Sequence, residues 1–246
     1  MVNLKSAIKR QFDKSFDTYD RYCSLQNEVC DHSIQLLKKQ ATDFEVMADF
    51  ACGTGESTLR LIERITHRQC YAIDFSDKLL SVAAHKLPST VHPILFDFEN
   101  NLFEAQTLDL IFCNMGLQWA LDLEKTFKLF QNYLNQSGYL VFSMPVKGNF
   151  PEIKQGFKYP LLAQEEISKH LEQSGFQVVE FCLYHSVRCF ESHKEALVSL
   201  KKVGANVSFQ QALRVNLRDV FVEDCVDPRL TYCVGIYVCR KENALC

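Results

Sequence analysis

The chain has 246 residues, of which 47% are hydrophobic and 23% are charged, and its formal net charge is −3 at pH 7. This length permits one large α/β domain with a well-buried core, or two small domains. The weak negative charge excludes attraction to nucleic acid by bulk electrostatics. No apolar run approaches the length of a membrane-spanning helix, so we expect no membrane partner.

The eleven cysteines are scattered along the chain. None of them forms a Cys-x-x-Cys pair or a Cys/His cluster with the spacing of a metal site, so the sequence predicts no bound metal. Many lie in apolar runs, where a thiol acts as a small core hydrophobe. We therefore expect a reduced, cytoplasmic protein.

The first half of the chain shows a regular order of elements. Residues 3–40 carry two helical patterns, and Ser24 is the predicted cap of the second. Strands are then predicted at 46–51, 70–73, 92–96, 109–113 and 138–144, and helices at 56–65, 77–86 and 121–134. This alternation is typical of parallel β-α-β units in a doubly wound sheet.

The second half is less regular. It predicts a helix at 164–174, a strand at 177–184, helices at 192–203 and 208–221, and a final strand at 230–240. The two late strands are expected to complete the same sheet. We expect one domain over 1–246, with N-terminal helices in 1–42, a cofactor-binding core in 43–145, and the remaining strands with a helical substrate lid in 146–246.

A glycine-containing loop, DFACGTGE at 49–56, joins the first predicted strand to the helix after it. Ligands of open α/β sheets bind at the carboxyl ends of the strands, so this loop is the expected cofactor site. Gly53 and Gly55 permit a close approach of the backbone. The loop lacks the Gly-Lys-Ser/Thr ending of a phosphate loop, and Asp49 suits an ammonium group instead.

Polar side chains also end the next three strands. Asp74 is placed to accept the hydroxyls of a ribose. Asp97, beside Phe98, is placed to accept the exocyclic amine of an adenine between apolar walls, and Asn114 is expected beside the reactive end of the cofactor. Each feature alone is more typical of a turn or a helix cap. The ordered set favours a single ligand.

The segments DFACGTG, YAIDFS, LFDFENNLF and DLIFCNMGLQWALDL resemble the class I S-adenosylmethionine-dependent methyltransferases. The segments FDKSFDTYDRYCSLQ, FSMPVKGNFPEI, SLKKVGAN and LTYCVGIYV resemble, more particularly, the malonyl-acyl-carrier-protein O-methyltransferases of biotin synthesis. Together they span the chain from about Lys9 to Tyr237.

The resemblance implies a Rossmann-like α/β fold with a mostly parallel seven-stranded sheet, and S-adenosyl-L-methionine as cofactor. It implies malonyl-acyl carrier protein as substrate and partner. Cofactor contacts are implied for the loop and strand-end residues Asp49, Ala51, Cys52, Gly53, Gly55, Asp74, Phe75, Asp97, Phe98, Asn114 and Leu117. Tyr19, Gln118 and Trp119 are implied to face the acceptor as catalytic residues.

Two departures from the family pattern stand out. Ala51 replaces the first glycine of the loop, which costs little if residue 51 has a negative φ and predicts at worst a weaker cofactor affinity. The segment between Pro151 and Glu166 is short and lacks the Arg that the family carries there. If that Arg binds the malonyl carboxylate in the family, another cation must take this role here. Candidates are Lys154, Lys158, Lys201, Lys202 and Arg229, of which the last three are our predicted substrate-binding residues.

The implied reaction needs no general base, because a carboxylate is already deprotonated near neutral pH. This agrees with the lack of a His-Asp or Cys-His motif. Because acyl carrier protein is acidic, we expect a basic rim around the site, with candidates at Lys194, Lys201, Lys202 and Arg214.

Three alternatives stay open: a methyltransferase for another small carboxylate or a quinone, a non-methylating assembly or hydroxylating factor, and a non-catalytic module.

Overall fold

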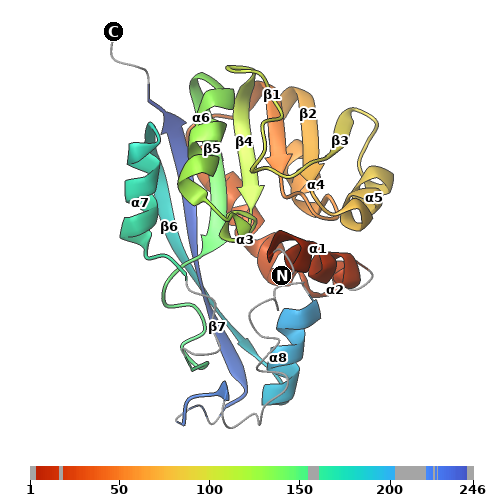
Figure 1. The fold of residues 1–246 in the computed structure, drawn as a ribbon, viewed down its shortest axis with the longest axis vertical. Coiled ribbons are helices and arrows are strands. Elements are labelled where there is room, and N and C mark those ends of the chain that lie inside the picture. Colours follow the sequence, from red (N-terminus) through yellow and green to blue (C-terminus); the bar gives the residue numbers. More distant parts are fainter. Residues whose placement is uncertain are drawn as a thin grey trace.

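The computed structural model describes residues 4–16, 19–154, 161–202, 220–223, 225 and 227–242, without the side chains of residues 15, 19, 201 and 202. Within these residues, seven strands form one sheet in the order β3-β2-β1-β4-β5-β7-β6. Figure 1 shows the sheet with helices on both faces. The strands are β1 (Asp43–Phe50), β2 (Thr66–Asp74), β3 (Val91–Leu95), β4 (Leu108–Asn114), β5 (Leu134–Pro145), β6 (Phe176–Cys189) and β7 (Arg229–Lys241).

The pairing of the strands confirms the predicted doubly wound sheet. β1 pairs in parallel with β2 and β4, and the parallel pairing continues to β3 and β5. β7 is antiparallel to both β5 and β6. The two late strands therefore complete the same sheet, as the sequence predicts.

The helices of the described residues cover the two faces of the sheet. The cluster on one face draws its helical residues from α3 (Ser24–Lys38), α4 (Glu56–Ile62) and α5 (Asp77–Lys86), and the cluster on the other from α6 (Leu123–Tyr133) and α7 (Gln164–Gln173). α1 (Leu4–Ser15) and α2 (Tyr19–Tyr22) lie where β1, β2 and β4 end. α8 (His193–Lys202) contacts α2 and β7, at the far end of the long β6–β7 pair (Figure 1).

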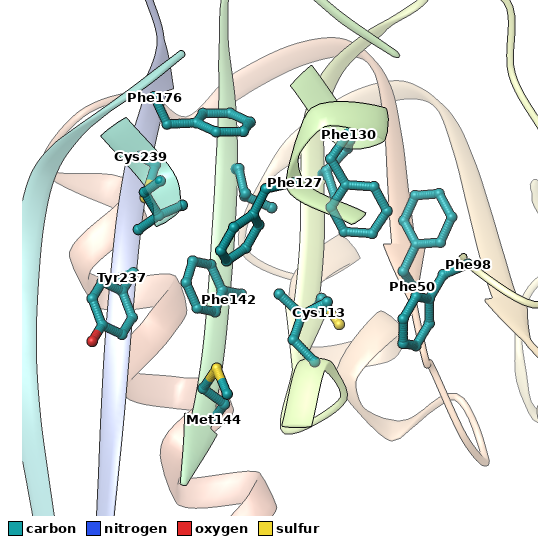
Figure 2. Packing of buried hydrophobic residues seen from close by; sticks show 14 of the residues in the cluster. Phe50, Phe98, Cys113, Phe127, Phe130, Phe142, Met144, Phe176, Tyr237 and Cys239 are labelled. Atoms are coloured by element: carbon teal, nitrogen blue, oxygen red, sulfur yellow. The ribbon is translucent and has the colours of Figure 1, made fainter. Parts of the chain in front are cut away.

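An aromatic core fixes the sheet against α6. Asp122 caps this helix by accepting a hydrogen bond from the Lys125 backbone N–H at 2.9 Å. Phe127 and Phe130, three residues apart, then share the buried face of the helix. Figure 2 shows both rings over the strands, and the Phe142 ring stacks on Tyr237 with centroids 4.7 Å apart. Burying each such side chain contributes roughly 1.5–3 kcal/mol, so this packing stabilises α6 against β5.

Most predicted elements are confirmed, with shifted ends. The strand predicted at 177–184 extends to Cys189. The prediction of Ser24 as a cap is wrong, because Cys23 is the N-cap of α3 and makes no side-chain cap bond. The helix predicted at 208–221 falls mostly outside the described residues, and its last position, Phe221, pairs with Ile153 in an isolated bridge.

None of the described helices combines the length and the apolar character needed to cross a membrane.

Candidate active site

The loop after β1 has a left-handed backbone at three positions. The φ angles are 58° at Ala51, 58° at Gly53 and 82° at Gly55. The favourable case considered for Ala51, a negative φ, is therefore not what the structure shows. An L-residue in this region costs roughly 1–2 kcal/mol, so Ala51 strains the loop where a glycine would not.

Gly55 serves the packing of the loop. A Cβ atom at this position would lie 3.1 Å from both Ala83 Cβ and Leu87 Cγ. The lack of a side chain therefore lets the start of α4 approach α5 closely. Packing against α5 therefore accounts for the second glycine of the loop, and no ligand contact is needed to explain it.

Asp49 is fully buried behind the loop. Its Oδ2 accepts hydrogen bonds from Ser57 Oγ at 2.7 Å and Thr58 Oγ1 at 2.6 Å, whereas its Oδ1 has no partner. Burial raises the pKa of this carboxyl to about 7, although the two hydroxyl groups oppose the shift. A buried carboxylate oxygen without a donor is an atom that an ammonium group would satisfy.

Asp74, at the end of β2, organises the loop from the side. Its two oxygens accept the backbone N–H groups of Gly53 at 2.9 Å and Ser76 at 2.8 Å. Burial raises its pKa to about 6, against the effect of these hydrogen bonds. Ser76 in turn caps α5 through the Leu79 N–H. Each carboxylate oxygen keeps a further lone pair for a ligand hydroxyl.

Asp97 and Phe98, after β3, hold a side chain from α1. Lys5 Nζ lies 2.9 Å from Asp97 Oδ1 and also pairs with Glu99. The same ammonium group lies 4.9 Å from the centroid of the Phe98 ring and 5.9 Å from that of Phe75. The acidic and aromatic groups predicted for adenine therefore already surround an N–H donor.

Asn114, at the end of β4, is held in one orientation. Ser143 Oγ donates to its Oδ1 at 2.8 Å, and its Nδ2 donates to the Gln26 carbonyl at 2.9 Å. Ser143 Oγ also accepts the N–H of Met115, a residue with φ of 53°. These bonds join β4, β5 and the start of α3 at one point.

A cavity lies among these strand ends. Its empty volume is about 510 Å³, including solvent at its mouth. Six of the predicted cofactor residues and one predicted catalytic residue line it: Ala51, Gly53, Asp74, Phe75, Phe98, Asn114 and Trp119.

Other predicted residues lie outside this lining. Asp49, Cys52 and Leu117 are buried, Gly55 packs on α5, and Asp97 pairs with the cavity residue Lys5. Gln118 donates to the Met115 carbonyl at 2.6 Å, and its buried Oε1 has no partner. Tyr19 is the first residue of α2, and its side chain is outside the described part.

The predicted substrate cations lie further along the chain. Arg229 begins β7, and its half-exposed side chain places Nε 3.9 Å from Glu152 Oε1. Lys201 and Lys202 end α8, and the structure does not describe their side chains; Lys158 and Arg214 are also outside the described residues.

The sequence interpretation missed six residues of the cavity: Lys5, Ile8, Phe12, Leu79, Met115 and Gly116. Ile8 and Phe12 belong to the helical apolar pattern at the N-terminus, whose contact with the strand ends is not visible in sequence. A side chain would not fit at Gly116, because a Cβ atom there would lie 2.6 Å from Ala51 Cβ. Lys5 carries no sequence signal.

The residues present fit S-adenosylmethionine. The cavity has the size of a small-molecule site. The loop brings backbone at Gly53 to it, Asp74 offers acceptors for hydroxyls, and Phe75 and Phe98 form apolar walls. The buried, unpartnered oxygen of Asp49 lies behind the same loop. In the part of the chain that the structure describes, no cluster of His, Cys, Asp or Glu has the arrangement of a metal site.

Comparisons with known proteins identify the fold and the family of the chain. A family model described as a methyltransferase domain matches residues 48–142. The chain resembles the solved phosphoethanolamine N-methyltransferase 2 of Haemonchus contortus, with a TM-score of 0.65 and 15% identity over 99% of this chain and 61% of that one. At that identity the likeness shows the fold alone.

Two curated relatives are closer in sequence. Malonyl-[acyl-carrier protein] O-methyltransferase 2 of Coxiella burnetii is 41% identical over 244 residues, which are 98% of each chain. Malonyl-[acyl-carrier protein] O-methyltransferase of a Marinomonas species is 27% identical over 84% of this chain and 79% of its own length.

The fold, the family model and the Coxiella burnetii relative together identify a class I methyltransferase that uses S-adenosylmethionine. The near full-length match at 41% identity identifies the particular family within this class. The chain belongs to the malonyl-[acyl-carrier protein] O-methyltransferase family.

Proposed function

We propose that the protein methylates the free carboxylate of malonyl-acyl carrier protein, in the cytoplasm, giving the methyl ester used in biotin synthesis. The observation that carries this proposal is the match to the Coxiella burnetii enzyme along nearly the whole length of both chains. The acceptor-binding half of the fold is included in that match, and not the cofactor core alone.

We infer an order of contacts with the cofactor, which the lining residues Gly53, Asp74 and Phe98 support. Asp49 and the loop at Gly53 would hold the methionine end, Asp74 the ribose, and Phe75, Asp97 and Phe98 the adenine. When bound there, S-adenosylmethionine supplies an electrophilic methyl group on a sulfonium. Asn114 and Trp119 would lie beside it, with Tyr19 and Gln118 facing the acceptor.

The work left to the protein is to align the acceptor and exclude water. An acceptor carboxylate needs no base at neutral pH. Ile8, Phe12 and Trp119 give the cavity apolar walls, and the Phe12 and Trp119 rings pack edge to face at 5.7 Å. A dry, weakly screening pocket favours a reaction in which opposite charges are consumed. Holding the reacting atoms at near-attack distance supplies several kcal/mol more, about 7–11 in well-oriented systems.

The acceptor carboxylate needs a cation, and we propose Lys201, Lys202 and Arg229 for this role. Lys201 and Lys202 end α8, and the contact of this helix with α2 and β7 supports a role near the strand ends that border the cavity. A neutral Gln at the responsible position should raise the KM for the malonyl carrier and leave cofactor affinity unchanged. The phosphopantetheine-linked acidic carrier is the proposed partner, with Lys194 of α8 at the basic rim.

Product analysis tests the acceptor. The protein is incubated with S-adenosylmethionine and, separately, malonyl carrier, malonyl-coenzyme A, free malonate and a quinone. We expect an added methyl on the malonyl carrier, located by mass spectrometry on the malonyl group of the phosphopantetheine arm. A methyl group found on the quinone or on free malonate, and not on the malonyl carrier, would contradict it.

A further inference from the structure

The ammonium group of Lys5 occupies the acidic and aromatic corner of the cavity. It lies 2.9 Å from Asp97 Oδ1, pairs with Glu99, and contacts the faces of Phe75 and Phe98. Only 15% of the Lys5 side chain is exposed. A lysine so enclosed is a bound group, and not a solvated one on a helix surface.

The partners of Lys5 are the groups suited to an adenine. A carboxylate that accepts from an exocyclic amine and rings that cover a heterocycle are also favourable partners for an ammonium group. Asp97 Oδ1 already accepts from Lys5 and from the Glu99 N–H at 3.1 Å. We propose that Lys5 is an internal competitor for the adenine end of the cofactor site, and that its ammonium group must leave Asp97 when the cofactor binds.

Polar contacts hold the helix of Lys5 in this place. Lys9 pairs with Asp77, and Ser76 Oγ donates to Asp13 Oδ1 at 2.6 Å. Ile8 and Phe12 of the same helix line the cavity. Lys9 and Asp13 therefore hold α1 at the start of α5, and Lys5 of the same helix contacts the predicted adenine walls.

Competition lowers the apparent affinity for the cofactor. When the binding-competent arrangement is only a fraction of the population, the measured Kd rises in inverse proportion to that fraction. Removing the Lys5 ammonium group leaves Asp97 and Glu99 without their counter-ion. A hydrogen-bond donor on the ligand then stabilises both carboxylates more than it does in the wild type. This inference rests on the cofactor placement of the proposed function and not on the identity of the acceptor.

The test is calorimetric binding to the full chain without any acceptor, so it stays interpretable if the proposed acceptor is wrong. Lys5→Met keeps an unbranched stem and removes the charge. We expect Kd at least threefold lower than wild type for S-adenosylmethionine, S-adenosylhomocysteine and adenosine, and no change for L-methionine. Lys9→Met, on the same helix but paired outside the cavity, is the matched control and should leave all four values unchanged.

Several results would overturn the inference. An unchanged or weaker affinity in Lys5→Met would show that Lys5 supports the site. Equal tightening in Lys9→Met would show a general loosening of α1. Tightening for S-adenosylmethionine without tightening for adenosine would show a net charge effect, because adenosine carries no charge. A wild-type protein that binds none of the four ligands would leave nothing for Lys5 to compete with.

Discussion

The methyl group of Ala51 faces the backbone of Gly116, where an added Cβ atom would lie only 2.6 Å from the Ala51 Cβ. Ala51 belongs to the loop after β1, and Gly116 follows β4, so the contact joins the two strand ends that border the cavity. Gly116 therefore leaves room for the methyl group of Ala51, which the glycine of the family pattern lacks. The alanine still has a strained left-handed backbone, with a φ of 58°.

Ala51→Gly should stabilise the protein. Relief of the left-handed alanine contributes roughly 1–2 kcal/mol, and the greater freedom of glycine in the unfolded chain takes back part of it. A net gain of about 1 kcal/mol should raise Tm by about 2–4 °C for a chain of this length. Ala48→Gly, in the regular interior of β1, is the control and should lower Tm. A lower Tm in both variants would contradict the strain at residue 51.

Gly116→Ala should destabilise the protein, because the new methyl group meets both Ala51 Cβ and Cys113 Sγ, the latter at 2.8 Å. Overpacking of this kind typically costs about 1–3 kcal/mol. Adding Ala51→Gly should recover part of the loss, since the clash with Cys113 remains. Denaturant unfolding of the two single variants and the double variant measures the coupling. Strictly additive effects would show that residues 51 and 116 do not touch.

Asp49→Asn should stabilise the protein more at pH 8 than at pH 5. The pKa of Asp49 is about 7 in the folded state, against an ordinary pKa of 3.8. The folded state therefore binds more protons between these values, and stability falls as pH rises through that window. Removing the buried charge should recover about 1–3 kcal/mol at pH 8, part of the roughly 4 kcal/mol that the full shift represents.

The same substitution should weaken cofactor binding, because a neutral amide attracts the ammonium group of the amino-acid end less than a carboxylate does. Thermal unfolding at pH 5 and 8, and calorimetry with S-adenosylmethionine at pH 8, provide the two measurements. A gain in Tm that is the same at both pH values would exclude Asp49 as the titrating group.

Ser143→Ala should lower both stability and cofactor affinity. The change removes the donor to Asn114 Oδ1 and one acceptor for the Met115 N–H. Leaving a fully buried acceptor unsatisfied costs about 1–3 kcal/mol, and we expect a loss at the lower end because Asn114 is half-buried. Asn114 and Met115 both line the cavity, so the change should also reach the cofactor. Ser33→Ala is the control, because Ser33 is equally buried and donates only to the Val29 carbonyl within α3. An unchanged cofactor Kd in Ser143→Ala would show that this network does not shape the site.

The sequence was sufficient for the strand ends of the site. Asp74 and Asn114 end apolar runs that alternate with helical patterns, and parallel strands bring their carboxyl ends to one edge. This local signal needs no knowledge of distant contacts. Ser76, two residues after Asp74, caps α5, so the predicted ligand role and the structural role coexist at neighbouring positions.

What sequence did not predict depends on contacts between distant segments. Lys5 meets Asp97 across 92 residues, and no local pattern distinguishes it from the other lysines of its helix. The sign of φ at Ala51 follows from the way the loop turns back beside β2, where Cys52 N–H donates to the Ile73 carbonyl at 3.0 Å. The extra length of β6 depends on its pairing with β7, since its end alternates between exposed and half-buried residues.

The central claim is methyl transfer to a carrier-bound malonyl carboxylate, and one measurement tests it most directly. S-adenosylmethionine with a labelled methyl group is incubated with the protein and either malonyl carrier or acetyl carrier, which differ only in the free carboxylate. The account predicts label on the malonyl carrier and none on the acetyl carrier. Cofactor binding without label on the malonyl carrier, or equal label on both carriers, would contradict it.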